Sequence, residues 1–353
     1  MTAADVRLGT PMQGVTLYSF TRDFHGRRYS FEDLVRKVAE RGLGPGLEIV
    51  GFQSIRDFPA VTDEFVNGFK QLLADTGLKP SALGANADAY LRRDRALTDD
   101  EMVEYMRAQI EVAHRLGFPV LRVQYSVTPD DMERLLPVAE ANDVRLGMEI
   151  HSKHSVRHPI IQALLERYEK LGSPYLGFIP DWGVSMRKVP RTLLSRFRAQ
   201  GADEKLLNAI DEMWDAGLER GPLLSDAEIG AERQAFGDLA RRFGGEKFAH
   251  DIMVNAAGLF GQQKPEDWLE VMKWTVHTHG KFYEIDEHGD EPSVPIREIM
   301  DVYLRAGYSG VISSEWEGFH FNDHDDAFDI IGKQQALLRR TAEELGSRLV
   351  TSL

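Results

Sequence analysis

Residues 145–181 read RLGMEIHSKHSVRHPIIQALLERYEKLGSPYLGFIPD, and this stretch indicates the fold class. It begins with a short run of strand-forming residues at 145–151 and ends with a second such run at 176–181. Between them, residues 158–170 place apolar side chains at the spacing of an amphipathic helix. The stretch therefore predicts a strand–helix–strand unit, in which the helix connects two parallel strands.

The same unit recurs along the chain of 353 residues. We expect eight strands, at 14–20, 46–50, 81–85, 120–125, 145–151, 176–181, 274–281 and 310–315. Helices are expected at 30–42, 62–76, 98–116, 129–141, 158–170, 295–306 and 327–345. This alternation predicts an α/β protein with a (β/α)8, or TIM-barrel, fold. A doubly wound open sheet would also fit, but no G-x-G-x-x-G turn follows the first strand.

One segment interrupts the alternation. Between Asp181 and Trp274 there is room for more than one strand–helix unit, and extra helices are expected at 204–217 and 226–243. We interpret residues 185–262 as a helical insertion after the sixth strand, on the catalytic face of the barrel. We expect it to shape the substrate mouth and to contribute to a protein interface. The predicted organisation is a single TIM-barrel domain, 1–353, that carries this insertion.

Composition and charge exclude several classes of protein. The 56 Asp and Glu residues outnumber the 42 Lys and Arg residues, and the net charge of −14 disfavours nucleic acids and anionic membranes as partners. Because the chain has no cysteine, it has no disulfide, thiolate nucleophile or Cys-bound metal. No signal peptide or membrane span is recognisable. We expect a cytoplasmic protein without an organic cofactor.

Four consecutive strand ends carry a carboxylate or an imidazole: Glu149, Asp181, His277 or His279, and Glu315. In a barrel, these ends meet at the catalytic face. Each residue alone has another explanation, such as a salt bridge, a turn cap or a buried structural histidine. Together they form an oxygen and nitrogen ligand set that suits Mn²⁺, Mg²⁺ or Co²⁺. The pattern therefore predicts one divalent ion per chain.

Two further residues are candidates for catalysis. Glu149 and His151 are two residues apart and share a strand face, so His151 is the predicted general acid/base, unless it is a hydrogen-bonded residue of the rim. His277, His279 and Lys281 share another face, and His279 is favoured as the ligand because it lies nearer the catalytic end. The choice between the two histidines stays open. Lys281 either neutralises an oxyanion or is a solvated cation on the rim.

Other residues near the strand ends are candidates for substrate binding. They are Tyr18, Asn86, Gln124, Trp182, His277, Phe319 and His320. Glu48 on the second strand is a weaker candidate. The aromatic residues among them would suit a flat substrate, although core packing explains them equally well.

These motifs resemble those of the xylose isomerase-like, sugar phosphate isomerase/epimerase superfamily of TIM barrels. The resemblance rests on the H-x-H-x-K motif at 277–281 and on GYSGVISSEWE at 307–317. It implies one divalent ion, preferably Mn²⁺, held by the four strand-end residues with His279 as the imidazole ligand. The segment GLGPGLEIVGFQS at 42–54 and the triplet EIH at 149–151 resemble, more closely, the large catalytic subunits, or alpha subunits, of bacterial C-glycoside deglycosidases.

The closer resemblance implies a metal-dependent carbon–carbon lyase. Its expected reaction is an elimination that cleaves a 3-oxo-C-glycoside from an aromatic aglycone, with His151 as acid/base and a small β-sandwich protein as second subunit. Two other classes stay open. One is a ketose epimerase, isomerase or inosose dehydratase that uses the same metal site, and the other is a barrel without enzymatic activity. An abasic-site endonuclease would need more ligands and a basic face, which the net charge of −14 disfavours.

Overall fold

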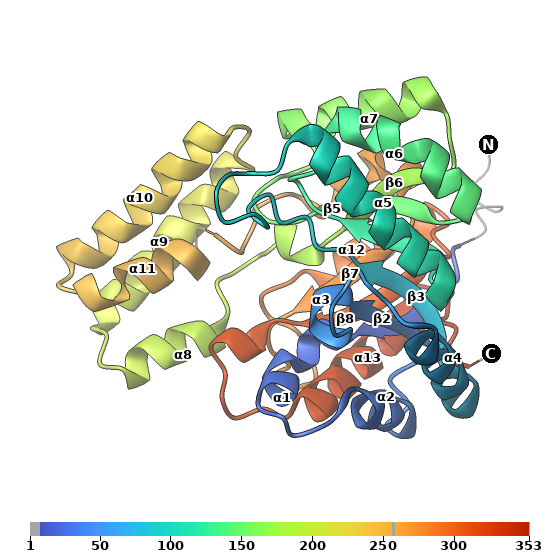
Figure 1. Ribbon diagram of the computed structural model, residues 1–353. Coiled ribbons are helices and arrows are strands. Elements are labelled where there is room, and N and C mark those ends of the chain that lie inside the picture. The colour runs from blue at the N-terminus through green and yellow to red at the C-terminus, as the bar shows by residue number, and fades with distance from the viewer. Residues whose placement is uncertain (1–7, 256–257, 353) are drawn as a thin grey trace, which may run out of the picture.

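The computed structural model describes residues 8–255 and 258–352, and within them eight parallel strands form a nearly closed barrel (Figure 1). The strands are β1 (Met12–Thr16), β2 (Gly46–Val50), β3 (Lys79–Gly84), β4 (Val120–Val123), β5 (Arg145–Ile150), β6 (Leu176–Pro180), β7 (Thr278–Phe282) and β8 (Val311–Trp316). Their order is β6-β5-β4-β3-β2-β1-β8-β7. Isolated parallel bridges from Phe178 to Thr275 and from Asp181 to His279 join β6 to β7. The predicted TIM barrel is confirmed.

Helices cover the outside of the barrel (Figure 1). The long ones are α2 (Phe31–Glu40), α4 (Asp63–Thr76), α5 (Asp99–Leu116), α6 (Pro129–Asn142), α7 (Pro159–Leu171), α12 (Ile296–Arg305) and α13 (Ala327–Glu344). Short helices α1 (Thr21–His25) and α3 (Gly51–Ser54) follow the first two strands. Hydroxyl side chains cap the first turns of α2, α4, α5 and α6, because each accepts a hydrogen bond from a backbone N–H three residues later.

Two predicted strands were too long. The run 14–20 leaves the sheet after Thr16, whose hydroxyl accepts a hydrogen bond from the backbone N–H of Tyr18 and begins the 3₁₀ helix η1 (Leu17–Phe20). The run 274–281 enters the sheet only at Thr278, because Met272–Trp274 forms the 3₁₀ helix η4. In both places apolar residues are buried without being extended, a distinction that hydrophobicity alone does not make.

Four α-helices lie between β6 and β7 in the described residues: α8 (Arg191–Ala199), α9 (Glu204–Arg220), α10 (Asp226–Arg242) and α11 (Glu246–Asn255). Figure 1 shows α9, α10 and α11 gathered to one side of the barrel. In the outer ring, the 3₁₀ helix η3 (Pro265–Glu270) packs between α7 and α12 instead. Asp267 and Glu270 of η3 bind Arg157 and Gln162 at the start of α7.

The chain enters and leaves these helices through a narrow neck. We use the name neck for residues 183–186 and 261–263, which run antiparallel with a bridge from Ser185 to Gln262. Backbone hydrogen bonds join Met186 to Gly261, Gly261 to Gly183, and Gln263 to Val184, at 2.8–3.0 Å. Both ends of the added segment are therefore fixed at one point of the barrel wall.

The interior of the barrel is divided into an apolar end and a polar end. Ala82, Val120 and Ile179 form a small buried cluster that is separate from the main core. Two residues further along the strands, on the same faces, Val120 is followed by Arg122 and Ile179 by Asp181. The polar side chains therefore lie toward the carboxyl ends of the strands. None of the helices in residues 8–255 and 258–352 is long and apolar enough to cross a membrane, and the cytoplasmic location stays a prediction.

We expect Gln335→Ala to lower the free energy of unfolding by about 1–3 kcal/mol, because two buried carbonyl oxygens lose a hydrogen bond. The amide of Gln335, on α13, donates to the backbone oxygens of Gly14 on β1 (3.2 Å) and Leu43 before β2 (2.9 Å). Urea denaturation measures the change. Gln71→Ala, at an exposed glutamine on α4, is the control and should shift stability by less than about 0.5 kcal/mol. Equal effects of the two substitutions would contradict this role for Gln335.

Candidate metal centre and active site

A cavity of about 630 Å³ opens at the carboxyl ends of the strands. Its lining includes Tyr18, Val50, Phe52, Arg122, Gln124, Tyr125, Glu149, His151, Ser152, Lys281, Glu315, Glu317 and His320. Val254, Asn255 and Leu259, from the segment between β6 and β7, line it as well. This segment therefore reaches the mouth of the cavity, where the sequence predicted it. Its part in a protein interface stays a prediction.

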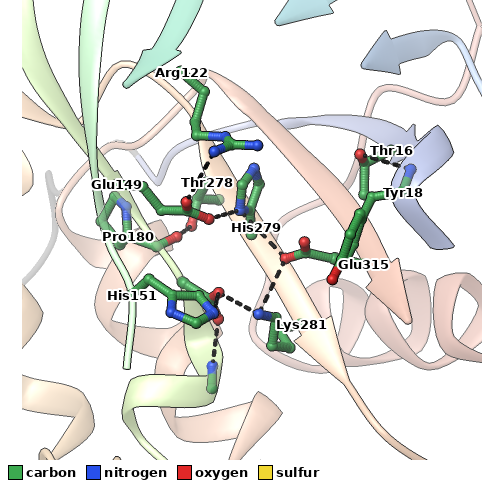
Figure 2. A network of polar contacts seen from close by, with 12 residues as sticks. Thr16, Tyr18, Arg122, Glu149, His151, Pro180, Thr278, His279, Lys281 and Glu315 are labelled. Carbon is green, nitrogen blue, oxygen red and sulfur yellow. Dashed lines mark hydrogen bonds and ion pairs between the residues drawn. The ribbon is translucent and has the colours of Figure 1, made fainter. Parts of the chain in front are cut away.

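The four predicted ligands come together at the inner end of this cavity. Glu149, Asp181, His279 and Glu315 are all buried, and one potential ligand atom of each lies within 4.8 Å of the others. Strand pairing places them, because Asp181 is bridged to His279 and Glu315 lies beside Lys281 in the β7–β8 register. Figure 2 shows Glu149, His279 and Glu315 pointing toward one another from different strands.

The histidine of the cluster is oriented by a carboxylate behind it. The Nε2 atom of His279 lies 3.0 Å from Oε1 of Glu48 on β2, and its Nδ1 atom lies 2.8 Å from Glu149 and 3.3 Å from Glu315. A proton on Nε2 shared with Glu48 leaves Nδ1 as the ligand atom. His277 instead directs its Nε2 to Oε2 of Glu48, 3.0 Å away. The geometry supports His279, rather than His277, as the ligand.

Asp181 has two separate uses. Its Oδ1 atom accepts a hydrogen bond of 2.8 Å from the backbone N–H of Gly183 and caps the 3₁₀ helix η2 (Trp182–Val184). Its Oδ2 atom has no hydrogen-bond partner and lies 2.6 Å from the Lys281 ammonium. The turn cap and the ligand position are therefore compatible, because each uses a different oxygen.

The residues present fit a divalent cation. Asp181 Oδ2, His279 Nδ1 and Glu315 Oε2 are buried and make no hydrogen bond, an arrangement that is costly unless a cation completes it. Burial, together with the nearby carboxylates of Asp181 and Glu317, raises the pKa of Glu315 to about 8. Although burial opposes it, the carboxylates of Glu315, Glu48 and Glu149 raise the pKa of His279 well above its usual value. Both shifts indicate an excess of buried negative charge, which a divalent ion would neutralise.

Lys281 is not a solvated cation on the rim, as one interpretation of the sequence had it. The side chain is 1% exposed, and its ammonium lies 2.6 Å from Asp181, 3.1 Å from Glu317 and 3.6 Å from Glu315. Although burial opposes it, these carboxylates raise the pKa of Lys281 well above its usual value. The lysine is therefore a permanent buried cation beside the proposed metal ligands, and its catalytic role stays a prediction.

Two residues of the site were missed in the sequence. Arg122, on β4, places its Nη1 atom 3.5 Å from Glu149 (Figure 2), and with His279 it holds the pKa of Glu149 well below its usual value, although burial opposes this. Glu317 follows β8 and pairs with Lys281. A signal for Arg122 was present, since it is a charged residue inside an apolar strand and shares a face with Gln124.

His151 reaches the cavity without joining the ligand cluster. Its Nδ1 atom lies 3.1 Å from the backbone oxygen of Ser152, and its Nε2 atom lies 3.6 Å from Asp181 (Figure 2). The hydroxyl of Tyr125 bonds both the backbone N–H and the backbone oxygen of His151, which fixes this position of the strand end. With Nδ1 bonded to the backbone, Nε2 is the nitrogen that is available for proton transfer.

The predicted substrate-binding residues are divided between the cavity and the core. Tyr18, Gln124 and His320 line the cavity. The others pack or bond elsewhere. Asn86 bonds Tyr105 and Gln109, Trp182 packs on Tyr303, His277 bonds Glu48, and Phe319 packs against Tyr18 and Trp316. The binding role of these four residues stays a prediction without a contact to the cavity among its lining residues.

Comparisons with known proteins agree with this geometry. No protein-family model matches the chain. The chain is 54% identical over 338 residues to a 3'-dehydrocarminate deglycosidase alpha subunit from a Microbacterium species, a match that covers 96% of this chain and 97% of that protein. It is 48% identical over 346 residues to a C-glycoside deglycosidase alpha subunit from Microbacterium trichothecenolyticum, covering 98% of this chain and 94% of that protein. A solved sugar phosphate isomerase/epimerase from Parabacteroides distasonis matches with a TM-score of 0.51 and 14% identity, over 95% of this chain and 94% of that one, and shares the barrel fold.

We expect graded losses of metal from three isosteric substitutions. Glu315→Gln removes a charged ligand and should abolish tight binding of Mn²⁺, whereas Glu48→Gln only loosens the orientation of His279 and should weaken binding by about 10–100-fold. Glu64→Gln, at an exposed residue of α4, is the control and should leave binding unchanged. Metal content after dialysis and calorimetric titration with Mn²⁺ measure these effects. Full metal content in Glu315→Gln would show that the site is misassigned.

Proposed function

Because the chain belongs to the family of C-glycoside deglycosidase alpha subunits, we propose that it cleaves the carbon–carbon bond between a sugar and an aromatic aglycone. The observation that carries the proposal is the arrangement of carboxylates. Glu149, Asp181 and Glu315 converge on one point with His279, and do not flank the cavity as a free pair. Hydrolysis by two opposed carboxylic acids would need such a free pair. The site is suited instead to chemistry next to a carbonyl group.

We propose a 3-oxo-C-glycoside as the substrate. One relative is named for a 3'-dehydro compound, in which a ketone replaces a sugar hydroxyl. A ketone at C3 acidifies the proton on C2. Removal of that proton, followed by cleavage of the bond from C1 to the aryl carbon, leaves a C1–C2 double bond in the sugar. The aryl carbon takes up one proton, so the reaction is a balanced elimination that consumes no water.

His151 is the proposed acid/base of this elimination. Its Nε2 atom faces the cavity beside Asp181, while Nδ1 is bonded to the backbone oxygen of Ser152. In this orientation the imidazole takes the phenol proton of the aglycone, so that electron density on the ring allows the departing carbon to be protonated. A divalent ion, for which we favour Mn²⁺, supplies positive charge that stabilises the negative charge developing on the substrate ketone.

Lys281 and Arg122 are proposed to control charge in the same cavity. Both are buried cations that line it, and they lie beside the carboxylates of Asp181 and Glu149. Lys281 is placed to neutralise negative charge on the substrate, in keeping with its predicted catalytic role. The volume of about 630 Å³ is large enough for a sugar joined to an aromatic group.

The proposal includes a second subunit. Both relatives are named alpha subunits, which implies a partner chain for them. We propose that this chain likewise works with a small β-sandwich subunit, which the segment of 185–262 at the mouth of the cavity contacts. A neighbouring reading frame that encodes such a protein would identify the partner.

We expect the chain, assayed with that partner, to release free aglycone from a 3-oxo-C-glycoside but not from the unoxidised C-glycoside, because only the ketone acidifies the C2 proton. Chelation should abolish turnover, and Mn²⁺ should restore it. Liquid chromatography with mass detection measures the aglycone and the unsaturated sugar. Epimerisation of free ketoses, without release of aglycone, would instead assign the site to a sugar epimerase.

Replacing His151 separates the acid/base role from metal binding. We expect His151→Ala to lower kcat by about 10²–10⁴-fold, because proton transfer loses its catalyst. Metal content should be unchanged, since the four proposed ligands remain. His25→Ala, at an exposed histidine, is the control and should keep full activity. Near-normal turnover would contradict the acid/base assignment, and loss of metal would make His151 a ligand.

A further inference from the structure

A second group of metal-ligand side chains lies outside the cavity described above. His154 and His158 are on the segment that joins β5 to α7, and Asp226 is the first residue of α10. One potential ligand atom of each lies within 4.8 Å of the others. None of the three lines the cavity, and none belongs to the first ligand cluster. The group is therefore a separate feature at the contact between the barrel and the added helices.

The imidazoles of this group have ring nitrogens without hydrogen-bond partners. Both nitrogens of His158 and Nδ1 of His154 are buried and unbonded in the part of the chain that the structure describes. His158 is 5% exposed and occupies the N-cap position of α7, yet its side chain makes no capping bond. Buried imidazole nitrogens normally have a partner, because leaving one unsatisfied costs about 1–3 kcal/mol. The arrangement is explained if a ligand completes it.

Charge pairing with Asp226 does not account for the group. The Nε2 atoms of His154 and His158 lie 3.7 and 3.8 Å from Oδ1 of Asp226, which is beyond hydrogen-bond distance. Burial lowers the pKa of His154 to about 4 and also lowers the pKa of His158, although Asp226 opposes both shifts. Both rings are therefore neutral near pH 7, the form that binds metal ions.

The distances suit a tetrahedral ion. Ligand atoms at about 2.0 Å from zinc lie about 3.3 Å apart around a tetrahedron, so the observed 3.7 and 3.8 Å require a contraction of only a few tenths of an ångström. Two imidazoles and one carboxylate favour Zn²⁺, whereas three carboxylates and one imidazole favour Mn²⁺ or Mg²⁺. Asp226 is exposed, so water can take the fourth position.

We propose that His154, His158 and Asp226 bind a zinc ion that fastens α10 to the segment following His151. The same segment contacts the added helices nearby. Its Lys153 ammonium lies 3.7 Å from Glu232 of α10. The ring of Tyr125, whose hydroxyl bonds the backbone of His151, packs edge-on against His154 at 4.1 Å. A zinc ion here joins the wall of the cavity to the added helices.

Metal titration of the full chain tests this site. After removal of bound metal, we expect the wild type to take up two zinc ions per chain, and His158→Ala and Asp226→Asn to bind one of them more than about 100-fold more weakly, because each loses a direct ligand. Glu315→Gln should lose the other ion and keep this one. With Co²⁺, the intense visible absorption of a four-coordinate ion should appear in wild type and Glu315→Gln, and disappear in Asp226→Asn.

Asp226→Asn keeps the test independent of folding, because the side chain is exposed and the substitution is isosteric. Asp99→Asn, at the equivalent exposed first position of α5, is the matched control for loss of a helix N-terminal charge. Hydrogen exchange supplies a second measurement: zinc should slow exchange at 152–158 and at the start of α10 in wild type and Asp99→Asn only. Unchanged zinc affinity in both Asp226→Asn and His158→Ala would overturn the proposal, whatever the first metal centre binds.

Discussion

Four carboxylates buried at one end of the barrel set the constraint on which the rest of the site depends. They are Glu149, Asp181, Glu315 and Glu317, none of them more than 7% exposed. Each would cost several kcal/mol without a compensating charge. The compensating side chains are Arg122, His279 and Lys281, which come from β4 and β7. Because β6 joins β7 only by isolated bridges, closure of the barrel and neutralisation of these acids depend on each other.

Much of this arrangement could be predicted from the sequence because strands alternate their faces. The spacing of Glu149 and His151, and of His279 and Lys281, predicted which side chains share a cavity, and the structure brings them there. The pairing of Glu48 with both histidines of β7 and its preceding turn could not be predicted, because it crosses the barrel interior. Such contacts depend on the closed sheet rather than on any local pattern.

The errors of the sequence analysis have a common physical origin. Apolar runs at 14–20 and 274–281 predicted strands longer than β1 and β7, since a buried 3₁₀ turn and a buried strand look alike in composition. The cluster of His154, His158 and Asp226 escaped notice for a different reason. Its members are separated by 68 residues between His158 and Asp226, and only the packing of α10 against the segment after β5 brings them together.

The neck at 183–186 and 261–263 separates two kinds of evolutionary change. Since the chain leaves and re-enters the barrel wall at paired residues, the helices beyond the neck can lengthen, shorten or be exchanged without shifting the register of any strand. The strand ends that carry the chemistry would stay in place through such changes. Val254, Asn255 and Leu259 belong to the exchangeable part and line the cavity, so one barrel can acquire a new molecular range by inheriting a new roof.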